Sequence, residues 1–563
     1  MISRRWLLPE PIDPAAVQAL AKAAGVARFA AELLLRRGVR SAEEARRFLD
    51  PRLQSLGDPF ALPNMDAAVT RIFAALDRGE KIVLYGDYDV DGVTSLALLT
   101  RVLRAYGAEA PCFLPLRADE GYGLSADGAA RCVAEFAPRL LIAVDCGTSS
   151  VAEIAALQAQ GVDVVVIDHH ECQGAPPPCV ALVNPKLGAD FHYLCSVGLV
   201  FKTAHALLKR RPLADFDLRA HLDLVALGTV ADLVPLVEEN RTLVKRGLVQ
   251  LAETRWVGLR ALIEVSGLRA PFSPPNVGFG LGPRLNAAGR LGTAQDALEL
   301  LLTEDVARAR TIATSLDTQN RERRAVEEDV VRQAELQLAE SFDAERDAAI
   351  VVGAPGWHTG VIGIAASRIQ KRHHRPTLVI GFDENGTGKG SGRSIAGFSL
   401  VAALAACGEF LEKHGGHEMA AGLTLQHARF DEFRAAFLAH ARAQLSAEQL
   451  QPRIHLDAEL TLGEIDYELL AHHEALQPFG MGQPQPLFVA RSITLAGEPR
   501  VMKEKHLSLM LRQHGDEYRA VWFGSAKDEL PRLPWDIAFQ IERNEWQGTV
   551  TPQIHIRAVR QSV

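Results

Sequence analysis

Three aspartates, Asp87, Asp89 and Asp91, stand two residues apart in the stretch "GDYDVDG", where the apolar segment "KIVLYG" ends. In an extended backbone, residues two apart point the same way, so the three carboxylates would lie side by side. Two like charges about 6 Å apart repel by roughly 3 kcal/mol at an effective dielectric constant near 20. Either protons or a divalent cation would relieve this repulsion. The stretch alone leaves a second interpretation open, a solvated acidic turn that caps the next helix.

Other apolar segments also end in acidic residues. "LLIAVD" ends at Asp145, and "LVALGTVAD" ends at Asp232. "DVVVIDHHE" supplies Asp168, His169 and His170. Carboxylates combined with imidazole suit Mn²⁺ or Mg²⁺ better than zinc. Two such ions bridged by a shared carboxylate are a common arrangement for phosphoester hydrolysis. The residues themselves therefore predict a metal-dependent hydrolase that acts on a phosphoester.

Glycine-rich segments supply side chains that phosphate groups and bases could bind. "LRADEGYGLS" contains Arg117 and Tyr122, and an aromatic ring on a polar loop could stack on a base. "GPRLNAAGRLG" and "GKGSGRS" add cationic and polar groups, namely Arg284, Asn286, Arg290, Lys389, Ser391 and Arg393. Each segment taken alone is more often an ordinary loop, so these residues are weaker candidates than the acids.

Alternation of strands and helices would bring the acids together. From about Lys81, the apolar runs "KIVLYG", "APCFLPL", "RLLIAVD" and "VDVVVID" are separated by amphipathic helical stretches. This order predicts an α/β fold with a parallel sheet buried on both faces. Crossovers of one hand place the carboxyl ends of all strands at one edge, where ligands bind in open α/β sheets. We therefore expect the acids to meet at that edge.

The rest of the chain predicts further domains. Residues 1–50 are expected to form an N-terminal helical segment, and residues 51–302 the domain with the parallel sheet. A charged, nearly glycine-free stretch at 303–346 predicts a long connecting helix. A second α/β domain is expected at 347–450. Short alternating runs such as "HLSLMLRQ" and "WDIAFQIERN" at 451–563 predict a small β-barrel or sandwich.

Composition narrows the functional class. A length of 563 residues indicates two to four domains. The net charge of −8 gives no overall attraction to nucleic acid, so any polyanion would need a local basic groove. No apolar run approaches the length of a membrane span, and the apolar part of "MISRRWLLPEPIDP" ends at Pro9, which argues against a secretory signal. Seven cysteines without a CxxC pair favour reduced thiols and a cytoplasmic location.

The motifs also resemble a known family. "GDYDVDG", "VDCGTS", "IDHHE" and "GTVADLVPL" are similar to the four motifs of the DHH phosphoesterases, and "GRS" with "GGHEMAAG" is similar to the companion DHHA1 domain. With "EGYGL" and "GPRLNAAGR", the resemblance extends from about Asp50 to the end of the chain. It points to the members that degrade single-stranded DNA from the 5′ end, release mononucleotides in recombination and repair, and bind single strands through a C-terminal OB fold.

The resemblance implies a role for each site residue. One ion, Mn²⁺ or Mg²⁺, would be held by Asp91, Asp145, His169 and Asp232. A second ion would share Asp145 and take Asp89, with help from Asp87. His170 would contact the scissile phosphate, and Asp168 would fix the histidine orientation. The residues that would line the DNA path are Arg117, Tyr122, Arg284, Asn286, Arg290, Ser391, Arg393 and His417.

Two positions depart from the family pattern. Tyr85 stands where many members have a histidine, so the second ion would depend on Asp87 or on substrate. His414 replaces the first of three glycines in the DHHA1 signature. The resemblance further implies a monomer that works with single-stranded-DNA-binding protein and with a recombination or repair helicase.

Two other functions compete with this hypothesis. One is hydrolysis of short oligonucleotides, cyclic dinucleotides or pyrophosphate, but proteins with that activity usually end after two domains. The other is a DNA-binding scaffold without catalytic activity, which should have lost metal ligands. Every acid of the proposed first site is present, and replacing Asp145 would separate an enzyme from a scaffold.

Overall fold

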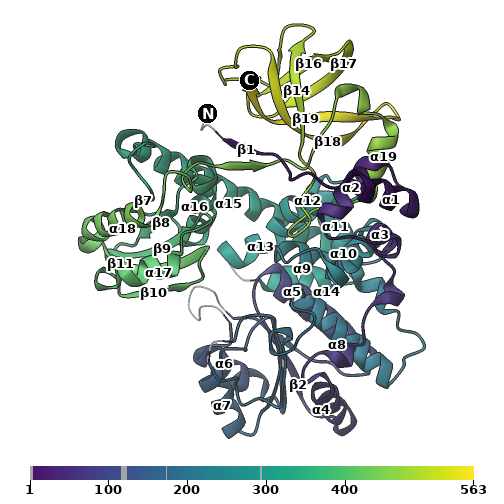
Figure 1. The fold of residues 1–563 in the computed structure, drawn as a ribbon. Helices are drawn as coiled ribbons and strands as arrows, with labels where there is room; N and C mark the ends of the chain where they lie inside the picture. Colours follow the sequence, from purple (N-terminus) through teal and green to yellow (C-terminus); the bar gives the residue numbers. More distant parts are fainter. Residues whose placement is uncertain (1–3, 116–122, 173, 292–293, 563) are drawn as a thin grey trace. The chain divides into compact units, whose positions relative to one another are not determined.

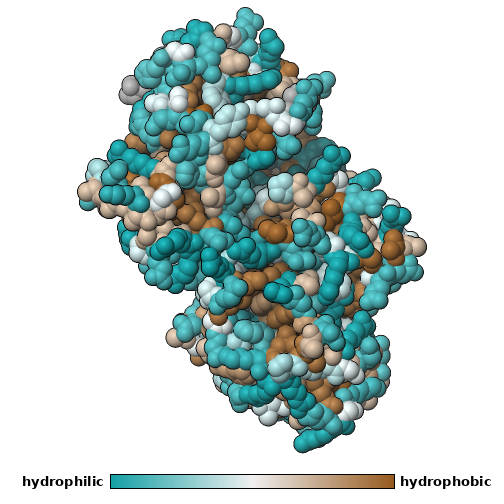
Figure 2. Space-filling view, turned by 90° about the vertical axis from the view of Figure 1, so that its right-hand side faces the viewer, coloured by the Kyte–Doolittle hydropathy of each residue, from teal (hydrophilic) through white to brown (hydrophobic). Residues whose placement is uncertain are grey.

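The computed structural model describes residues 4–115, 123–172, 174–291 and 294–562 (Figure 1). It divides into two compact units. The larger unit contains residues 9–317 and 457–563, and the smaller unit contains residues 1–8 and 318–456. On the face drawn in Figure 2, hydrophobic residues lie in scattered groups among hydrophilic ones. Among the residues that the structure describes, no helix combines the length and the apolar character that crossing a membrane requires.

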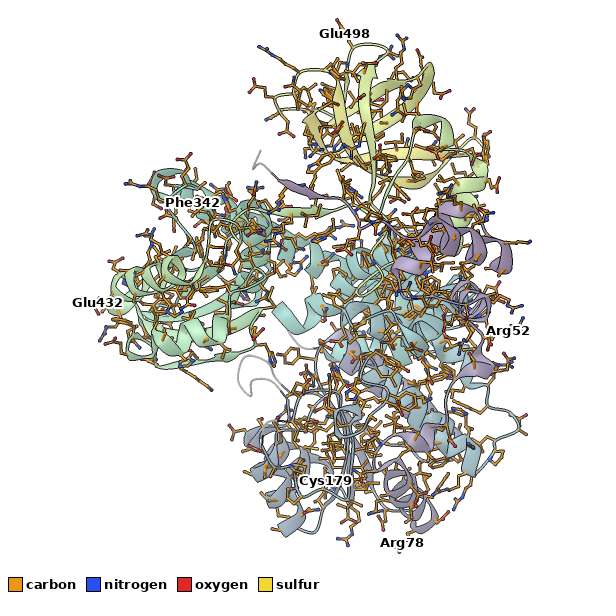
Figure 3. All side chains as sticks on the ribbon, viewed as in Figure 1. Arg52, Arg78, Cys179, Phe342, Glu432 and Glu498 are labelled. Atoms are coloured by element: carbon orange, nitrogen blue, oxygen red, sulfur yellow. The ribbon has the colours of Figure 1, made fainter. Side chains whose placement is uncertain are left out.

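A five-stranded parallel sheet organises the larger unit. Its strands, in spatial order, are β3 (Cys112–Phe113), β2 (Ile82–Gly86), β4 (Leu140–Val144), β5 (Asp163–Ile167) and β6 (Ala181–Val183). Every residue of β2 and β4 is buried, which explains their continuous apolar sequence. The predicted parallel α/β sheet is therefore confirmed. Arg78 and Cys179, labelled in Figure 3, lie in the part of the unit that holds this sheet.

Helices cover both faces of the sheet. The first face packs against α4 (Met65–Arg78), α5 (Val90–Ala105) and α8 (Ser196–Arg210), and the second against α6 (Ala126–Phe136) and α7 (Val151–Ala159). Alternate residues of β2 enter different cores, with Leu84 in the first and Tyr85 in the second. Tyr85 is fully buried, stacks on Phe113 at 5.1 Å between ring centroids, and donates a hydrogen bond to the carbonyl oxygen of Gly123 (3.2 Å).

Further helices complete the larger unit. They are α1 (Pro14–Ala24), α2 (Arg28–Arg36), α3 (Ala42–Leu49), α9 (Leu222–Ala231), α10 (Glu238–Ala252), α11 (Val257–Ser266), α12 (Pro274–Asn276), α13 (Gly282–Leu291) and α14 (Gln295–Leu302). The short helical turns are η1 (Leu53–Ser55), η2 (Pro59–Ala61), η3 (Pro185–Leu187), η4 (Leu218–His221), η5 (Val277–Leu281) and η8 (Leu462–Glu464). α9 is buried along nearly its whole length, because it packs against α5, α8 and α10.

A seven-stranded sheet forms most of the C-terminal part of the larger unit. Its order is β13 (Ala458–Glu459), β14 (Phe488–Leu495), β18 (Trp535–Trp546), β19 (Thr549–Gln561), β17 (Asp516–Trp522), β16 (His506–Gln513) and β15 (Arg500–Met502). Because β14 pairs with both β18 and β16, the sheet closes on itself. Its core also includes side chains from α1, α2 and α19 (Tyr467–Ala475). Alternating hydrophobicity predicted a barrel or a sandwich here, and the structure has the barrel that the resemblance implied.

The smaller unit contains a mixed five-stranded sheet. Its order is β10 (Lys413–Gly416), β11 (Ala420–Gln426), β9 (Thr387–Arg393), β8 (Thr377–Phe382) and β7 (Ile350–Pro355). The unit also holds α16 (Thr359–His373), α17 (Leu400–Ala406), η6 (Gly408–Phe410), η7 (His427–Arg429) and α18 (Phe430–Gln444). β1 (Arg5–Leu7) pairs in parallel with β12 (Arg453–His455), so the first described element is a strand rather than a helix. The long helix α15 (Val306–Ser341) contributes residues to both units.

A buried ion pair holds α8 against α10. Lys202 of α8 is fully buried, and its Nζ lies 3.0 Å from Oε2 of Glu239 and donates to the carbonyl oxygen of Gly57 at 2.7 Å. Oε1 of Glu239 accepts a hydrogen bond from the amide of Gly57 at 2.6 Å. Both charges are therefore compensated inside the protein, and the pair fixes the helix whose first residues face the acidic motifs.

We expect Glu239→Ala to lower the free energy of unfolding by about 3 kcal/mol, because the substitution leaves a buried ammonium group without its carboxylate. Urea unfolding measures this change. Glu238→Ala, which alters an exposed neighbour on the same helix, is the control and should change stability by less than about 0.5 kcal/mol. Equal effects of the two substitutions would contradict the prediction.

Candidate metal centre

Three acids follow three neighbouring strands directly. The register pairs Gly86 with Val144, and Val144 with Ile167. Asp87, Asp145 and Asp168, the residues that come next, therefore start from adjacent points along one edge of the sheet. Ligand atoms of Asp87, Asp89 and Asp145 all lie within 4.8 Å of one another. The sheet edge predicted from the strand pattern does gather these acids.

The acids of "GDYDVDG" do not share one extended segment, as the i, i+2, i+4 spacing suggested. α5 begins at Val90, and Asp89 is its N-cap, with a side chain that accepts a hydrogen bond from the amide of Gly92 at 3.0 Å. Asp91 therefore lies in the first turn of the helix. Its ligand atom groups with those of Cys195 and Asp232 within 4.8 Å, rather than with Asp87 and Asp89. The helix start separates the three aspartates into two groups.

The N-terminus of α8 holds Asp91. The carboxylate accepts hydrogen bonds from the amides of Ser196 (2.7 Å) and Val197 (2.8 Å). Exposed amides at a helix start favour negative charge. Burial and the charge of Asp89 nevertheless raise the pKa of Asp91 to about 7. The hydrogen bonds from the N-terminus of α8 therefore offset only part of the free-energy cost of burying this carboxylate.

Asp145 has an unusual backbone conformation. Its φ of 61° lies in the left-handed region, which is uncommon for residues other than glycine and often occurs at functional sites. The side chain is buried, and Oδ1 accepts a hydrogen bond from the hydroxyl of Ser196 at 2.9 Å. Burial, together with the charges of Asp91 and Asp89, raises the pKa of Asp145 well above its usual range. Nothing in the sequence around position 196 singles this serine out.

Asp232 comes from a helix rather than a strand. The apolar segment before it forms α9, and Leu233 then turns the chain with a φ of 60°. Oδ2 of Asp232 lies 3.6 Å from Nε2 of His169, which lies 3.5 Å from Oδ1 of Asp145. Burial and the charge of Asp91 raise the pKa of Asp232 to about 8. Nε2 of His169 thus lies near carboxylate oxygens from two other elements, and ligand atoms of Asp145, His169 and His170 also lie within 4.8 Å of one another.

Two ligand atoms of this group are available to bind a divalent metal ion. Nε2 of His169 and Oδ2 of Asp232 are buried and make no hydrogen bond within the described part of the chain. Buried polar atoms without a partner are rare in proteins. Ligand atoms about 2.1 Å from an octahedral ion lie about 3 Å from their nearest neighbours, close to the separations seen here. The donor set of carboxylates and one imidazole fits Mn²⁺ or Mg²⁺.

The adjacent histidines have opposite electrostatic environments. Burial and the charge of His170 lower the pKa of His169 to about 4, which keeps it neutral, as a metal ligand must be. Burial also lowers the pKa of His170, but the hydrogen bond and the charge of Asp168 outweigh it and raise the value to about 9. Nδ1 of His170 lies 2.6 Å from Oδ1 of Asp168. His170 is therefore a cation at neutral pH.

The carboxylate of Asp168 accepts hydrogen bonds from three backbone amides, two of which belong to the histidine pair. Its Oδ1 accepts the amide hydrogens of His169 (2.8 Å) and His170 (3.3 Å), and its Oδ2 accepts that of Thr148 (3.0 Å). Burial raises the pKa of Asp168, but the hydrogen bond and the charge of His170 outweigh burial and lower the pKa below its usual range. The carboxylate remains charged and orients His170, as the resemblance implied.

The DNA-path candidates are only partly described. Arg117 and Tyr122 lie outside the described residues, as does the side chain of Arg290. Arg284 on α13 pairs with Asp317 at 2.9 Å and donates to the carbonyl oxygen of Gly280. Asn286, on the same helix, is half-buried. The structure therefore shows Arg284 in an ion pair rather than as a free cation.

The remaining candidates lie in the smaller unit. Ser391 and Arg393 are on β9, where Nη1 of Arg393 lies 3.2 Å from Oγ of Ser391. His417 is exposed and follows β10, and its amide donates to the carbonyl oxygen of Ala420 at 2.8 Å. His414, the departure from the glycine signature, is exposed on β10. The role of these residues in binding DNA stays a prediction.

Comparisons with known proteins support the resemblance. The models described as "DHH family, N-terminal domain", "DHHA1 domain" and "RecJ OB domain" match residues 81–229, 347–443 and 456–558. The chain is 36% identical to the single-stranded-DNA-specific exonuclease RecJ of Bacillus subtilis, over 98% of this chain and 70% of that protein. It is also similar to the crystal structure of Thermus thermophilus RecJ in complex with Mn²⁺ (TM-score 0.85, 33% identity, covering 99% of this chain and 80% of that one). A Thermus RecJ structure with Mg²⁺ has a TM-score of 0.79, with 31% identity over 99% and 79% of the two chains.

The raised pKa values of Asp91 and Asp232 predict how metal binding depends on pH. Both pKa values lie above those of the same acids in an unfolded chain. The free energy of unfolding of the metal-free protein therefore falls as pH rises from about 4 to about 8. A bound cation stabilises the charged carboxylates and so removes this loss of stability. The increase in unfolding temperature on adding Mn²⁺ should therefore grow by about 5 °C between about pH 6 and pH 8.

Thermal unfolding with Mn²⁺ or with EDTA at each pH measures this difference. Asp232→Asn supplies the control: it removes one of the two ionising groups and leaves Asp91, so the growth with pH should be clearly smaller than in the wild type. A stabilisation by Mn²⁺ that is the same at both pH values would contradict the prediction.

Proposed function

The chain belongs to the RecJ family of single-stranded-DNA-specific exonucleases, and from this premise we propose that it hydrolyses single-stranded DNA from a strand end with divalent metal ions. The observation that carries the proposal is the convergence of Asp145, His169 and Asp232, with separations of 3.5 and 3.6 Å between their ligand atoms. These side chains come from two strand ends and one helix end. The protein is on this basis a metal-dependent exodeoxyribonuclease.

The proposed ligands divide into two sets. Asp91, Asp145, His169 and Asp232 would hold one ion, and Asp145, Asp89 and Asp87 the other. The crystal structures of Thermus thermophilus RecJ in complex with Mn²⁺ and with Mg²⁺ support either metal as the bound ion. When bound, ions of this kind activate a water molecule and stabilise the attacking and leaving oxygens of a phosphoester. Tyr85 is buried against Phe113 and donates its hydroxyl proton to the carbonyl oxygen of Gly123, so the second ion would not gain a ligand at that position.

His169 and His170 have different roles in the proposed reaction. His169 binds through a neutral nitrogen, while His170 carries a proton that Asp168 holds on Nδ1. We assign the other ring nitrogen, Nε2, to the scissile phosphate, where a positive charge would neutralise an oxygen and where a proton could pass to the leaving oxygen. Asp168 keeps the ring in this orientation.

Support for the substrate comes from the family rather than from the metal centre. We propose cleavage in the 5′-to-3′ direction with release of mononucleotides, along a path lined by the predicted DNA-binding residues Arg117, Tyr122, Arg284, Asn286, Arg290, Ser391, Arg393 and His417. The C-terminal barrel matches the RecJ OB domain and would hold the strand. A monomeric state, a cytoplasmic location, and partnership with single-stranded-DNA-binding protein and a repair helicase are further proposals of the same kind.

The alternative functions are less well supported. Hydrolysis of small oligonucleotides or cyclic dinucleotides would not require the barrel of residues 456–558. A DNA-binding scaffold without activity would not need His169 and Asp232 to bury polar atoms without hydrogen-bond partners among the described residues. Both observations favour the exonuclease.

Single strands labelled at either end test the substrate and the polarity. With Mn²⁺, we expect a 5′-labelled strand to lose its label at once as a mononucleotide, while a 3′-labelled strand shortens progressively. Duplex of the same sequence should be resistant, and EDTA should abolish hydrolysis. Early loss of the 3′ label, or equal cleavage of blunt duplex, would overturn the proposed polarity or strand specificity.

Asp145→Ala tests the metal centre separately from DNA binding. Because both proposed ions share this residue, the turnover number should fall by about a thousandfold or more. Affinity for single-stranded DNA, measured by fluorescence anisotropy in EDTA, should stay within about threefold. Asp127→Ala, which removes an exposed acid from the first turn of α6, is the matched control. If Asp145→Ala retains activity, the chain does not use this centre.

A further inference from the structure

A single buried serine contacts two of the proposed metal ligands. The amide of Ser196 donates to Oδ2 of Asp91 at 2.7 Å, and its hydroxyl donates to Oδ1 of Asp145 at 2.9 Å. Ser196 is fully buried, and each of the two acids is 2% exposed or less. The residue therefore joins the helix that carries Asp91 to the strand end that carries Asp145.

The hydroxyl of Ser196 donates a hydrogen bond to Asp145 and does not cap its own helix. Ser196 is the first residue of α8, and the N-cap position before it is Cys195, which makes no side-chain capping hydrogen bond. A serine that capped the helix would accept a hydrogen bond from an amide of the first turn. Here the hydroxyl proton goes to a carboxylate that starts from a different element.

The bonded oxygen is the one that faces the histidine ligand. Oδ1 of Asp145 accepts from Ser196 and also lies 3.5 Å from Nε2 of His169. A carboxylate oxygen has two lone pairs, and one of them is directed at the hydroxyl. The other lone pair is left for an ion bound beside Nε2 of His169. Because the backbone of Asp145 is in the left-handed region, this contact from α8 fixes a side chain that the strand itself does not orient.

We propose that Ser196 is a positioning residue of the metal centre, which sets the distance between Asp91 and Asp145 and aims Oδ1 of Asp145 at the ion. This inference rests on the proposed function, since it assumes that both acids bind metal. Groups that orient metal ligands commonly change metal affinity by about 10- to 100-fold when they are lost.

Ser196→Ala isolates the hydroxyl, because alanine keeps the amide that binds Asp91. We expect the Kd for Mn²⁺ to rise about tenfold, as measured by electron paramagnetic resonance of free Mn²⁺ during titration, without DNA and without an activity assay. At saturating Mn²⁺, kcat should return to within about threefold of the wild-type value, because the ligands themselves are intact. Ser196→Thr, which restores the hydroxyl, should bind Mn²⁺ within about threefold of wild type.

Thr203→Val is the matched control. Thr203 is a fully buried hydroxyl residue on the same helix, but its hydroxyl donates to the carbonyl oxygen of Leu199 at 2.9 Å. It should leave the Kd for Mn²⁺ within about threefold while costing similar thermal stability. If Ser196→Ala does not fold, Ser196→Cys replaces it with the same expectation, because a thiol is a weak donor of similar size.

The outcomes separate this inference from the proposed function. A wild-type protein that binds no Mn²⁺ would overturn both. A wild-type protein that binds Mn²⁺, with a Ser196→Ala variant whose Kd lies within about threefold of it, would overturn the role of Ser196 alone. An equal loss of affinity in Thr203→Val would do the same, because it would attribute the effect to general packing.

Discussion

Mutual repulsion among buried carboxylates is the constraint on which the rest of the site depends. Asp91 and Asp145 are almost completely buried, and the charge of Asp91 raises the pKa of both Asp145 and Asp232. A single strand or helix does not carry these acids. The fold instead brings the acids from β2, β4, β5, α5 and α9, and holds them with the amides and hydroxyl at the start of α8. Burial of apolar side chains in the packed cores on both sides of the sheet offsets the unfavourable energy of this repulsion.

Much of this arrangement could be predicted from the sequence, because a parallel sheet has simple rules. Continuous apolar strands that each end in an acid must present those acids at one edge, which is where Asp87, Asp145 and Asp168 lie. The alternating pattern at the C-terminus likewise predicted a barrel or a sandwich. These inferences succeeded because they needed only the period of hydrophobic residues and the direction of the strands.

Other features depend on contacts between distant segments, which no local pattern encodes. The spacing of Asp87, Asp89 and Asp91 suggested one extended row, but the helix start at Val90 turns Asp91 toward α8 and α9. The sequence marks Asp145 as a site residue, but it signals neither the left-handed backbone there nor the hydrogen bond from the hydroxyl of Ser196, which forms where β4 and α8 pack together. The different protonation states of His169 and His170 could not be predicted either, because they depend on which of the two rings contacts Asp168, and that ring is His170.

Steric constraints at two glycines explain why the acidic motifs contain them. A Cβ atom at Gly92 would lie 2.4 Å from the carbonyl oxygen of Asp87, so only glycine lets α5 begin directly against the end of β2. A Cβ atom at Gly228 would lie 2.5 Å from Oγ1 of Thr94 and 2.9 Å from Oδ1 of Asp91, which would separate α9 from α5. Since α9 ends at Asp232 and α5 carries Asp91, any such separation would widen the gap between these two ligands. The glycines in "GDYDVDG" and "LGTVAD" are therefore part of the geometry of the metal centre, although neither can bind an ion through a side chain.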